Sequence, residues 1–376
     1  MVRTRWLALV AGGVAATVLV MASGTGRDDV ATSPPSTATT TSSTSPTTAR
    51  VATSTTAPQP DPELGSGRSI TIAFAGDTNF DGQMGDRLRA DPTTAIGPFA
   101  VVLSVADLAV GNLETAVGTV GTPEPKQYTY LAPPEAVDAM RAGGFKVLSM
   151  ANNHGRDYGA VGLAESLEVR AAQPDGILIG IGADDADAYK PFRTVVKGQR
   201  VAVIAATQVI DTELVTDWTA APGHPGLASA KDVDRLVAAV RAARADSDTL
   251  VVFLHWGVEH DACPSSAQQS LAQALADAGA DIVVGAHTHR LQGAGFLGRT
   301  FVGYGLGNFD FYGTDDATRM GVVRVTVTGR RVDGYDLVPG RIHGSLAVPL
   351  TGEAASEAKA VWDARRDCTA LTAGPT

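Results

Sequence analysis

The sequence predicts an α/β protein in which mixed β-sheets are layered with helices, and three observations support this class. From about residue 68 onward, short apolar runs alternate with helical patterns. The runs are apolar at both alternating positions, as is typical of strands covered on both faces. Near the C-terminus, two runs flank a glycine-containing turn, which indicates an antiparallel hairpin. Alternation places helices on both sheet faces, and the hairpin makes the sheet mixed or doubles it into a sandwich.

The N-terminal residues 1–24 have the pattern of an export signal. Two arginines precede an uncharged apolar run over 6–22, and small residues follow it. The run also reaches the lower limit for a helix that spans a bilayer, so a cleaved signal peptide and a retained anchor are both open. The basic flank predicts an extracytoplasmic protein, secreted or held at the membrane by this segment alone.

Residues 25–67 form a segment dominated by Ser, Thr, Ala and Pro. Such a segment has few apolar side chains to bury, so it cannot offset the entropy lost on ordering its backbone. We expect a disordered linker, either a spacer or a connection without a specific role. The folded domain is then expected over 68–350, with a C-terminal helix and tail over 351–376.

The strands and helices of this domain follow from the positions of the apolar runs and from local start and stop signals. Predicted strands span 70–75, 108–110, 147–150, 177–181, 201–206, 250–254, 282–284 and 301–304, and the hairpin strands span 322–327 and 331–338. Predicted helices span 94–106, 134–142, 160–172, 231–245, 265–278 and 354–366. Pro134 suits the first turn of its helix, and Ser229 is a candidate N-cap for the helix at 231–245.

The charge of the chain limits its partners. The formal net charge is -10. An acidic protein has nothing to offset the repulsion of a phosphate backbone, so we expect no nucleic-acid partner.

The chain has only two cysteines, Cys263 and Cys368. In an exported protein an even pair predicts one disulfide. Two unpaired buried thiols are the alternative.

Metal-binding side chains follow the apolar runs at five strand ends. The candidate residues are Asp77, Glu114, Asn153, His154, His255, His287 and His289. Because ligands of α/β folds gather at the carboxyl edge of the strands, we expect these side chains to converge. A single histidine after a strand is usually a hydrogen-bonded loop residue. Four of the chain's seven histidines, together with two carboxylates and an amide, instead predict a metal site.

The ligand types limit the metal and suggest its chemistry. No cysteine lies at these strand ends, which excludes a closed zinc–thiolate site. Carboxylate, amide and imidazole ligands suit divalent Mn, Fe or Zn. A carboxylate such as Glu114 can bridge two ions about 3.5–4 Å apart. Two such ions acidify water and neutralise a phosphoryl oxygen, which phosphoester hydrolysis requires.

The motifs between residues 70 and 312 resemble those of the CapA family, associated with poly-γ-glutamate capsule synthesis, within the calcineurin-like metallophosphoesterase superfamily. The resembling pieces are Gly76-Asp77, Gly111-Asn112-Leu113-Glu114, Asn152-Asn153-His154, His255-Trp256-Gly257, Gly285-Ala286-His287-Thr288-His289 and Leu306-Gly307-Asn308-Phe309. Each piece is weak alone, but six in this order are specific. The resemblance implies a calcineurin-like metallophosphatase fold, a four-layer α/β/β/α sandwich.

The resemblance also implies a role for each candidate residue. Asp77 and His289 would hold one metal ion, and Glu114 would bridge the two ions. The second ion would be held by Asn153, His255 and His287. His154 would be a catalytic residue that binds no metal and acts as an acid or electrostatic partner for the leaving group.

The sequence departs from the superfamily pattern at two positions and from the pattern of CapA-like proteins at a third. Asn79 replaces a histidine common two residues after the first aspartate, and Glu114 replaces the usual bridging aspartate. Thr288 stands where CapA-like proteins often have proline, which leaves the ligand spacing unchanged. Two loops remain ambiguous: residues 126–130 are expected near substrate, and the turn at 306–309 either lines the substrate side or is only a tight turn.

Three functions remain open at this point. The first is a two-metal hydrolase that acts on a phosphoester or an anionic envelope polymer. The second is a non-catalytic accessory or export subunit of a membrane-bound poly-γ-glutamate synthase. A polymer-binding wall module is the third, although it does not need this set of metal ligands.

Overall fold

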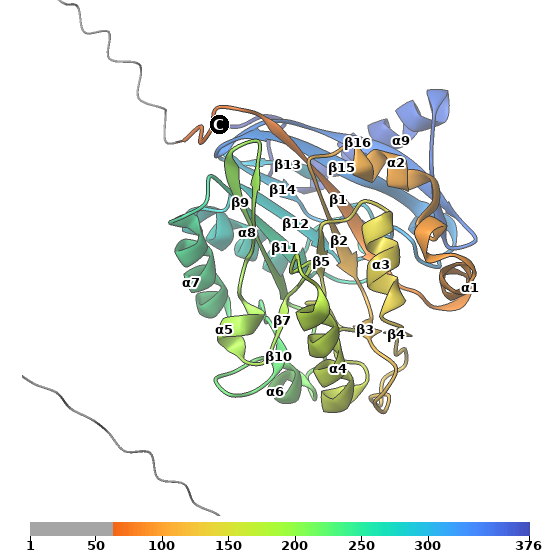
Figure 1. Ribbon diagram of the computed structural model, residues 1–376. Helices are drawn as coiled ribbons and strands as arrows, with labels where there is room; N and C mark the ends of the chain where they lie inside the picture. The colour runs from red at the N-terminus through yellow and green to blue at the C-terminus, as the bar shows by residue number, and fades with distance from the viewer. Residues whose placement is uncertain (1–62) are drawn as a thin grey trace, which may run out of the picture. The chain divides into compact units, whose positions relative to one another are not determined.

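The computed structural model describes residues 63–376, and within them two large β-sheets pack against each other (Figure 1). The predicted export signal at 1–24 lies outside the described residues, as does the linker at 25–67 up to residue 62. In the described part of the chain, no helix has the length and apolar character that a membrane span needs.

The first sheet has seven strands and contains the N-terminal strand of the domain. Its order is β17 (Leu346–Pro349), β16 (Arg331–His343), β15 (Arg319–Thr328), β1 (Ile70–Thr78), β2 (Leu108–Leu113), β5 (Val147–Ser149) and β6 (Leu178–Ile179). The strands from β1 to β6 are parallel, whereas β15 joins β1 antiparallel. The sheet is therefore mixed, as predicted.

The second sheet has six strands, with a parallel centre and antiparallel edges. Its order is β13 (Ala294–Leu297), β14 (Thr300–Gly303), β12 (Ile282–Ala286), β11 (Thr249–His255), β9 (Gln199–Thr207) and β8 (Phe192–Val196). The pairs β14–β12, β12–β11 and β11–β9 are parallel. Two small sheets pair β3 (Ala116–Val117) with β4 (Leu131–Ala132), and β7 (Ile181–Gly182) with β10 (Gly226–Leu227).

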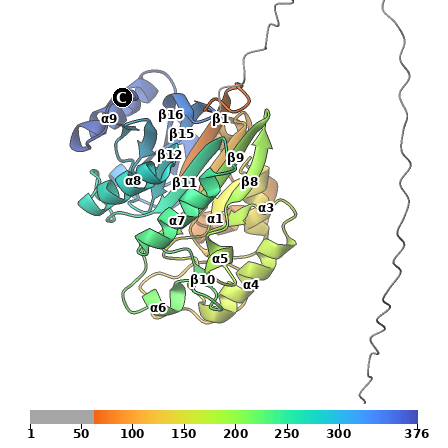
Figure 2. The ribbon, with the colours of Figure 1, turned by 90° about the vertical axis from the view of Figure 1, so that its left-hand side faces the viewer.

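Helices cover the outer face of each large sheet (Figures 1 and 2). The first sheet is covered by α1 (Gly82–Ala90), α2 (Ala100–Ser104), α3 (Glu135–Ala142) and α4 (Gly159–Ala172). The second is covered by α7 (Val233–Arg244) and α8 (Ser266–Ala278). Two short helices, α5 (Asp185–Ala188) and α6 (Val215–Trp218), lie near β7 and β10. The predicted four-layer α/β/β/α arrangement is confirmed.

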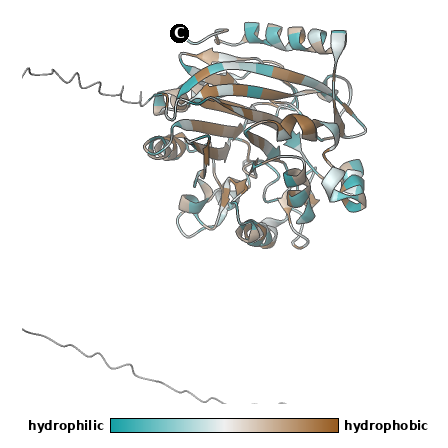
Figure 3. Cartoon of the chain, turned by 45° about the horizontal axis from the view of Figure 1, so that its top comes forward, coloured by the Kyte–Doolittle hydropathy of each residue, from teal (hydrophilic) through white to brown (hydrophobic). Residues whose placement is uncertain are grey.

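The alternation of side chains along each strand explains why the sheets are apolar on both faces. Along β1, Ile72 and Phe74 point into the core between the sheets, while Ala73 packs toward the helices. Along β11, Phe253 faces the first sheet and Leu254 faces α7 and α8. Figure 3 shows the result, with apolar strands in the interior and polar surfaces on the outer helices.

Two predicted elements are broken by glycine. The predicted strand at 177–181 divides at Gly180, whose φ of 86° turns the chain, so β6 and β7 belong to different sheets. The predicted helix at 94–106 is wrong in its first half. That stretch forms 3-10 turns, Pro92–Thr94 and Gly97–Phe99, before α2. Gly97 has a φ of 66°, and Pro98 has no N–H to donate.

The helix starts are partly as predicted. The N-cap of α7 is Asp232, which accepts a hydrogen bond from the Arg235 N–H at 3.0 Å, so the prediction of Ser229 is wrong. Ser229 instead follows β10 and forms a β-bridge with Thr207. Pro134 directly precedes the first residue of α3, close to its predicted place.

The C-terminal residues are held against both large sheets, at β16 of the first and β13 of the second. Helix α9 (Gly352–Ala364) packs on β16, and its Trp362 joins the core between the sheets. The Trp362 indole donates to the Gln292 carbonyl at 3.0 Å. Cys263 and Cys368 form the predicted disulfide. The end of the chain is therefore fixed near the loop that follows β11.

Candidate metal centre

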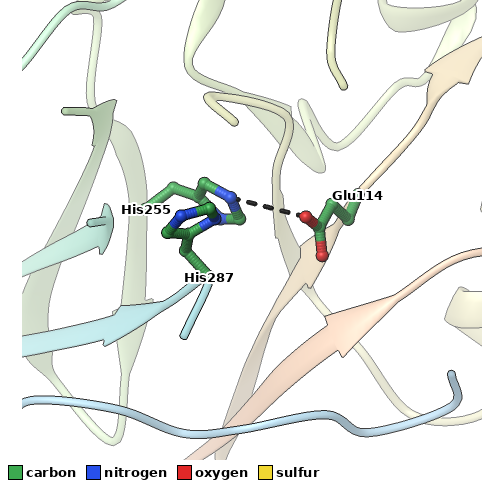
Figure 4. Close-up of side chains that lie close together, drawn as sticks. All are labelled: Glu114, His255 and His287. Carbon is green, nitrogen blue, oxygen red and sulfur yellow. Dashed lines mark ion pairs between the residues drawn. The ribbon is translucent and has the colours of Figure 1, made fainter. Parts of the chain in front are cut away.

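The candidate metal ligands meet where the strands of the two sheets end. Asp77 lies in β1 and Glu114 directly follows β2, whereas His255 ends β11 and His287 directly follows β12. All four side chains are buried. Figure 4 shows His255 and His287 from the second sheet facing Glu114 from the first. The sheet architecture thus brings together residues that are distant in sequence.

Two groups of potential ligands share one carboxylate. Glu114, His255 and His287 offer ligand atoms that lie within 4.8 Å of one another, and so do Asp77, Glu114 and His289. Glu114 Oε1 lies 3.4 Å from His255 Nε2. Glu114 is therefore the carboxylate that both groups have in common.

Asn153 lies beside the first of these groups. Its Oδ1 is 2.7 Å from His255 Nε2. The structure therefore brings together all six predicted metal ligands, and their roles as ligands remain predictions.

A turn with unusual backbone angles carries the two histidines after β12. His287 has a φ of 92° and His289 a φ of 53°. Few non-glycine residues adopt such angles, and those that do are usually held in place by their surroundings. Here the His287 N–H donates to the Asp77 carboxylate at 3.1 Å. The same carboxylate thus orients the turn and takes part in the site.

A chain of buried amides orients Asp77. Asn112 donates from Nδ2 to Asp77 Oδ1 at 2.8 Å and lies 3.2 Å from His255 Nδ1. Asn152 donates from Nδ2 to Asn112 Oδ1 at 3.1 Å and accepts from the His154 N–H at 3.0 Å. These asparagines occur in the sequence motifs, but the sequence did not assign them this orienting role.

Unpartnered buried atoms show that the site fits divalent cations. Both Glu114 carboxylate oxygens and His287 Nδ1 have no hydrogen-bond partner among residues 63–376. Burial, and then the neighbouring Asp77, raise the pKa of Glu114 well above its usual value. The ionised form of such a buried carboxylate costs free energy unless a nearby cation compensates its charge.

The buried imidazoles are in the form that binds metal. Burial, and then the charge of His289, lower the pKa of His287 to about 3. Burial, and then the charge of His287, lower the pKa of His255 well below its usual value. Both rings are therefore neutral near pH 7, as metal ligation requires.

His289 differs from the other two histidines. Burial acts to lower its pKa, but Asp77, Asn308 and Glu259 together outweigh burial and raise the pKa. His289 Nδ1 lies 3.3 Å from Asp77 Oδ2 and 2.7 Å from Asn308 Oδ1. Asn308 belongs to the turn at 306–309, so this turn contacts the site and is more than a tight connection.

His154 belongs to neither group of potential ligands. Its Nδ1 lies 2.5 Å from Asp157 Oδ2, and its ring packs 4.4 Å from the ring of Tyr130. Burial lowers its pKa and the Asp157 carboxylate opposes that shift. Asp157 was not among the predicted site residues, although an acidic residue three positions after a candidate catalytic histidine was a usable signal.

Comparison with known proteins identifies the family. Residues 71–312 match the family described as "Bacterial capsule synthesis protein PGA_cap", which is more than half of the chain. The chain belongs to this PGA_cap family. The resemblance to CapA proteins is thereby confirmed.

Curated relatives include two CapA proteins of Bacillus. The chain is 33% identical to the "Capsule biosynthesis protein CapA" of Bacillus anthracis over 222 residues, 58% of this chain and 53% of the relative. It is 31% identical to the "PGA biosynthesis protein CapA" of Bacillus subtilis strain 168 over 235 residues, 62% of this chain and 60% of the relative. The matches thus span little more than half the length of these relatives.

A third relative and two solved structures are more distant. A Mycobacterium tuberculosis protein named "Probable polyglutamine synthesis accessory protein Rv0574c" is 28% identical over 194 residues, half of each chain. A hypothetical protein from Thermus thermophilus aligns with a TM-score of 0.48 at 15% identity, over 73% of this chain and all of that one. A 5'-nucleotidase from Candida albicans aligns with a TM-score of 0.42 at 10% identity, over 79% of this chain and 58% of that one.

In this PGA_cap protein an open cleft of about 590 Å³ lies beside the metal-ligand candidates. Its lining includes His154, His289, Tyr128, Tyr130, Glu259, His260, Asn308, Phe311 and Tyr312. Of the predicted substrate loop at 126–130, the two tyrosines line the cleft, whereas Lys126 is not part of the lining. The cleft thus gives a ligand access to His154 and His289 from one side.

Asn79 is buried near the end of β1. Its Oδ1 accepts a hydrogen bond from the Asp81 N–H at 3.3 Å, and its Nδ2 has no partner among the described residues. Its carbonyl oxygen is thus already engaged by the backbone, and we assign it no metal.

Proposed function

We propose that this protein is an extracytoplasmic, metal-dependent phosphoesterase that acts in the synthesis or processing of poly-γ-glutamate or a related envelope polymer. The observation that carries the proposal is Glu114, a fully buried carboxylate that two groups of potential ligands share and whose oxygens have no hydrogen-bond partner within residues 63–376. Two divalent ions held by these groups would acidify water and neutralise the charge of a phosphoryl group.

The residues of the chain supply the rest of the chemistry. The cleft admits the phosphoester so that its phosphorus lies toward Glu114 and its leaving group toward His154. A water molecule gives up one proton to solvent and its oxygen forms the new bond to phosphorus, while the bond from phosphorus to the leaving oxygen breaks with its electron pair. His154 Nε2 then gives its proton to that oxygen, which leaves as an alcohol. The Asp157 carboxylate at Nδ1 stabilises the doubly protonated ring that this donation requires.

Three observations support a role in envelope polymer metabolism outside the cytoplasm. The relatives from Bacillus are named for capsule and PGA biosynthesis. Disulfides such as Cys263–Cys368 persist mainly in oxidising compartments. The sequence of residues 1–24 has the composition of an export signal.

The test is phosphoesterase activity of the purified full-length protein supplied with Mn, Fe or Zn. We expect metal-dependent turnover of 4-nitrophenyl phosphate and of an alkyl phosphate. The His154→Ala variant should lose at least about 100-fold on the alkyl phosphate, whose leaving oxygen needs a proton, as for removal of a general acid. Full activity in both His154→Ala and Glu114→Ala would refute the proposal.

A second candidate function is a non-catalytic accessory subunit of a polymer synthase. The observation that favours it is the relative named as an accessory protein of polyglutamine synthesis. Complementation of a polymer-deficient strain separates the two functions. If His154→Ala restores polymer as well as the wild type does, the accessory role is favoured over the hydrolase.

A further inference from the structure

The carboxylate of Asp157 is held by more groups than its partnership with His154 requires. Besides His154 Nδ1, its Oδ2 accepts the Tyr130 N–H at 2.8 Å. Its other oxygen, Oδ1, accepts from Lys126 Nζ at 2.7 Å. The Asp157 side chain is completely buried, and its hydrogen bonds in the described part of the chain go to Lys126, Tyr130 and His154.

Lys126 connects this carboxylate to the metal-ligand side of the site. Its Nζ also donates to the backbone carbonyl of Asn153, the residue whose side chain lies beside His255. The same ammonium lies 4.8 Å from the centre of the Trp218 ring, within reach of a cation–π contact. Three segments far apart in sequence thus meet at one ammonium group.

Lys126 lies outside the lining of the cleft. Its side chain is 10% exposed and does not line the cleft. Four residues further on, Tyr130 does line the cleft and packs on the His154 ring. Residues 126–130 therefore contact the His154–Asp157 pair at two points. Lys126 binds the Asp157 carboxylate, and Tyr130 packs on the His154 ring where it lines the cleft.

We propose that Lys126 is the positioning residue of the site: by joining Asp157 Oδ1 to the Asn153 carbonyl, it fixes the His154–Asp157 pair relative to the predicted metal ligand Asn153. The catalytic consequence rests on the proposed function, whereas the positioning itself does not. Without the ammonium, Asp157 Oδ1 is buried without a partner, so the carboxylate turns or admits water and His154 loses its fixed orientation.

The direct test observes the hydrogen bond between His154 and Asp157 by proton NMR of the full-length, zinc-treated protein labelled with ¹⁵N-histidine. A short bond from a ring N–H to a carboxylate gives a strongly downfield proton signal, which His154→Gln identifies by its absence. We expect the signal in the wild type and in Lys126→Arg, which keeps a cationic donor, and its loss in Lys126→Met. Lys231→Met, which removes an exposed lysine elsewhere, is the matched control and should keep it.

Activity gives a second readout that a merely structural role would not produce. 4-Nitrophenolate leaves without a proton, whereas an alkoxide needs one, so misplacement of His154 should affect alkyl phosphates more. We expect Lys126→Met to lose about tenfold or more in kcat on an alkyl phosphate but less than about threefold on 4-nitrophenyl phosphate. Equal losses on both substrates would contradict the proposal.

The two proposals fail in different ways. Persistence of the downfield signal in Lys126→Met, or its absence from the wild type, would overturn the role of Lys126. An inactive wild type that shows the signal, and loses it in Lys126→Met, would refute the phosphoesterase function but support the positioning role. A similar melting temperature in both lysine-to-methionine variants would show that loss of the signal is local.

Discussion

At the scale of single residues, Glu114 combines properties that are unfavourable without a cation. It is fully buried, its oxygens lack hydrogen-bond partners among residues 63–376, and it lies close to another carboxylate, Asp77. Proteins tolerate such a group where binding of a positive charge compensates for it. Its surroundings therefore indicate a function rather than a contribution to the stability of the fold.

Replacing Glu114 with glutamine tests whether its carboxylate binds metal ions. Glu114→Gln keeps the size of the side chain but removes the charge that two ions would share. We expect bound metal to fall from two ions to one or none, and affinity or activity to fall by more than the roughly 10–100-fold typical of changes around a metal site. Metal analysis after dialysis measures this, with the exposed Glu213→Gln as control. Two tightly bound ions in Glu114→Gln would contradict it.

A second buried carboxyl, Asp310, gives a prediction about pH. Its Oδ1 accepts the Ala347 N–H at 2.7 Å, and its Oδ2 has no partner in the described part of the chain. Burial raises the pKa of Asp310 well above its usual value, against the opposing effects of that hydrogen bond and of Arg87. The folded state therefore binds this proton more tightly than the unfolded state does. The resulting stability is fully present below the unfolded pKa of about 3.9 and is lost as pH rises through the folded pKa.

We therefore expect Asp310→Asn to gain stability relative to the wild type as pH rises from 4 to 8. Each pKa unit of elevation corresponds to about 1.4 kcal/mol once the wild-type carboxyl is ionised. Urea unfolding at pH 4, 6 and 8 measures the difference, with the exposed Asp211→Asn as control. A difference that does not change with pH would rule out the elevated pKa.

The sequence predicted those site residues that lie at the ends of apolar strands. Asp77 and His255 lie in the last residues of β1 and β11, and Glu114 and His287 directly follow β2 and β12, so strand order alone places them at one edge. Asp157 lies in a turn beyond its strand, where no apolar pattern indicates its direction. The Lys126 ammonium reaches it only through the path of a long loop, which local pattern does not specify.

At the scale of elements, the site depends on close contact between β1 and the turn at 306–309. A Cβ on Gly76 would lie 1.7 Å from the Gly307 carbonyl oxygen, so only glycine allows this approach. Across the contact, the Asp77 N–H donates to the Gly307 carbonyl at 3.0 Å. The contact sets the distance between Asp77 and Asn308, which both hold His289.

Gly76→Ala should weaken metal binding although it alters no ligand. The methyl group must separate β1 from the turn and so move Asp77 away from His289. We expect metal affinity to fall by about tenfold or more, comparable to loss of an orienting partner. Calorimetric titration with zinc measures it. Gly334→Ala, at a position with open space around the glycine, should leave affinity unchanged, and equal affinity in both variants would contradict the account.

Central strands were easier to predict than edges or interrupted helices. β9, β11 and β12 are buried on both faces and appear in the sequence as continuous apolar runs. The edge strand β8 alternates between half-buried and exposed residues and gives no such run. Helix α1 was missed because polar and charged residues surround its few buried positions, Met84, Gly85 and Leu88.

At the scale of the whole domain, the Cys263–Cys368 disulfide closes a long segment that includes α8, β12 and β16. The two cysteines are 105 residues apart. Closing a loop of that length lowers the entropy of the unfolded chain, which corresponds to about 4–5 kcal/mol in the free energy of unfolding. Removal of a native disulfide typically lowers the free energy of unfolding by about 2–5 kcal/mol. The bond also holds the loop after β11, which carries Glu259 and His260 of the cleft.

The double variant Cys263→Ser/Cys368→Ser should therefore unfold at lower denaturant concentration. We expect the free energy of unfolding to fall by about 2–5 kcal/mol, measured by urea titration under oxidising conditions. Reduced wild-type protein should behave in the same way. Unchanged stability in both would show that the disulfide does not constrain the domain.

The family and the layer architecture could both be predicted from the sequence. The family depends on several motifs in a fixed order, and the architecture depends on apolar runs that alternate with helical patterns. The identity of the substrate does not have such a signature. It depends on how Tyr128, Tyr130 and Tyr312 shape the cleft, and these lie on loops whose path only tertiary contacts determine.

Crystals of the protein soaked in manganese test the central claim most directly, through anomalous diffraction. The account predicts two manganese peaks about 3.5–4 Å apart, both next to the carboxylate of Glu114, one near Asp77 and His289 and the other near His255 and His287. A single peak, or manganese bound away from Glu114, would contradict it.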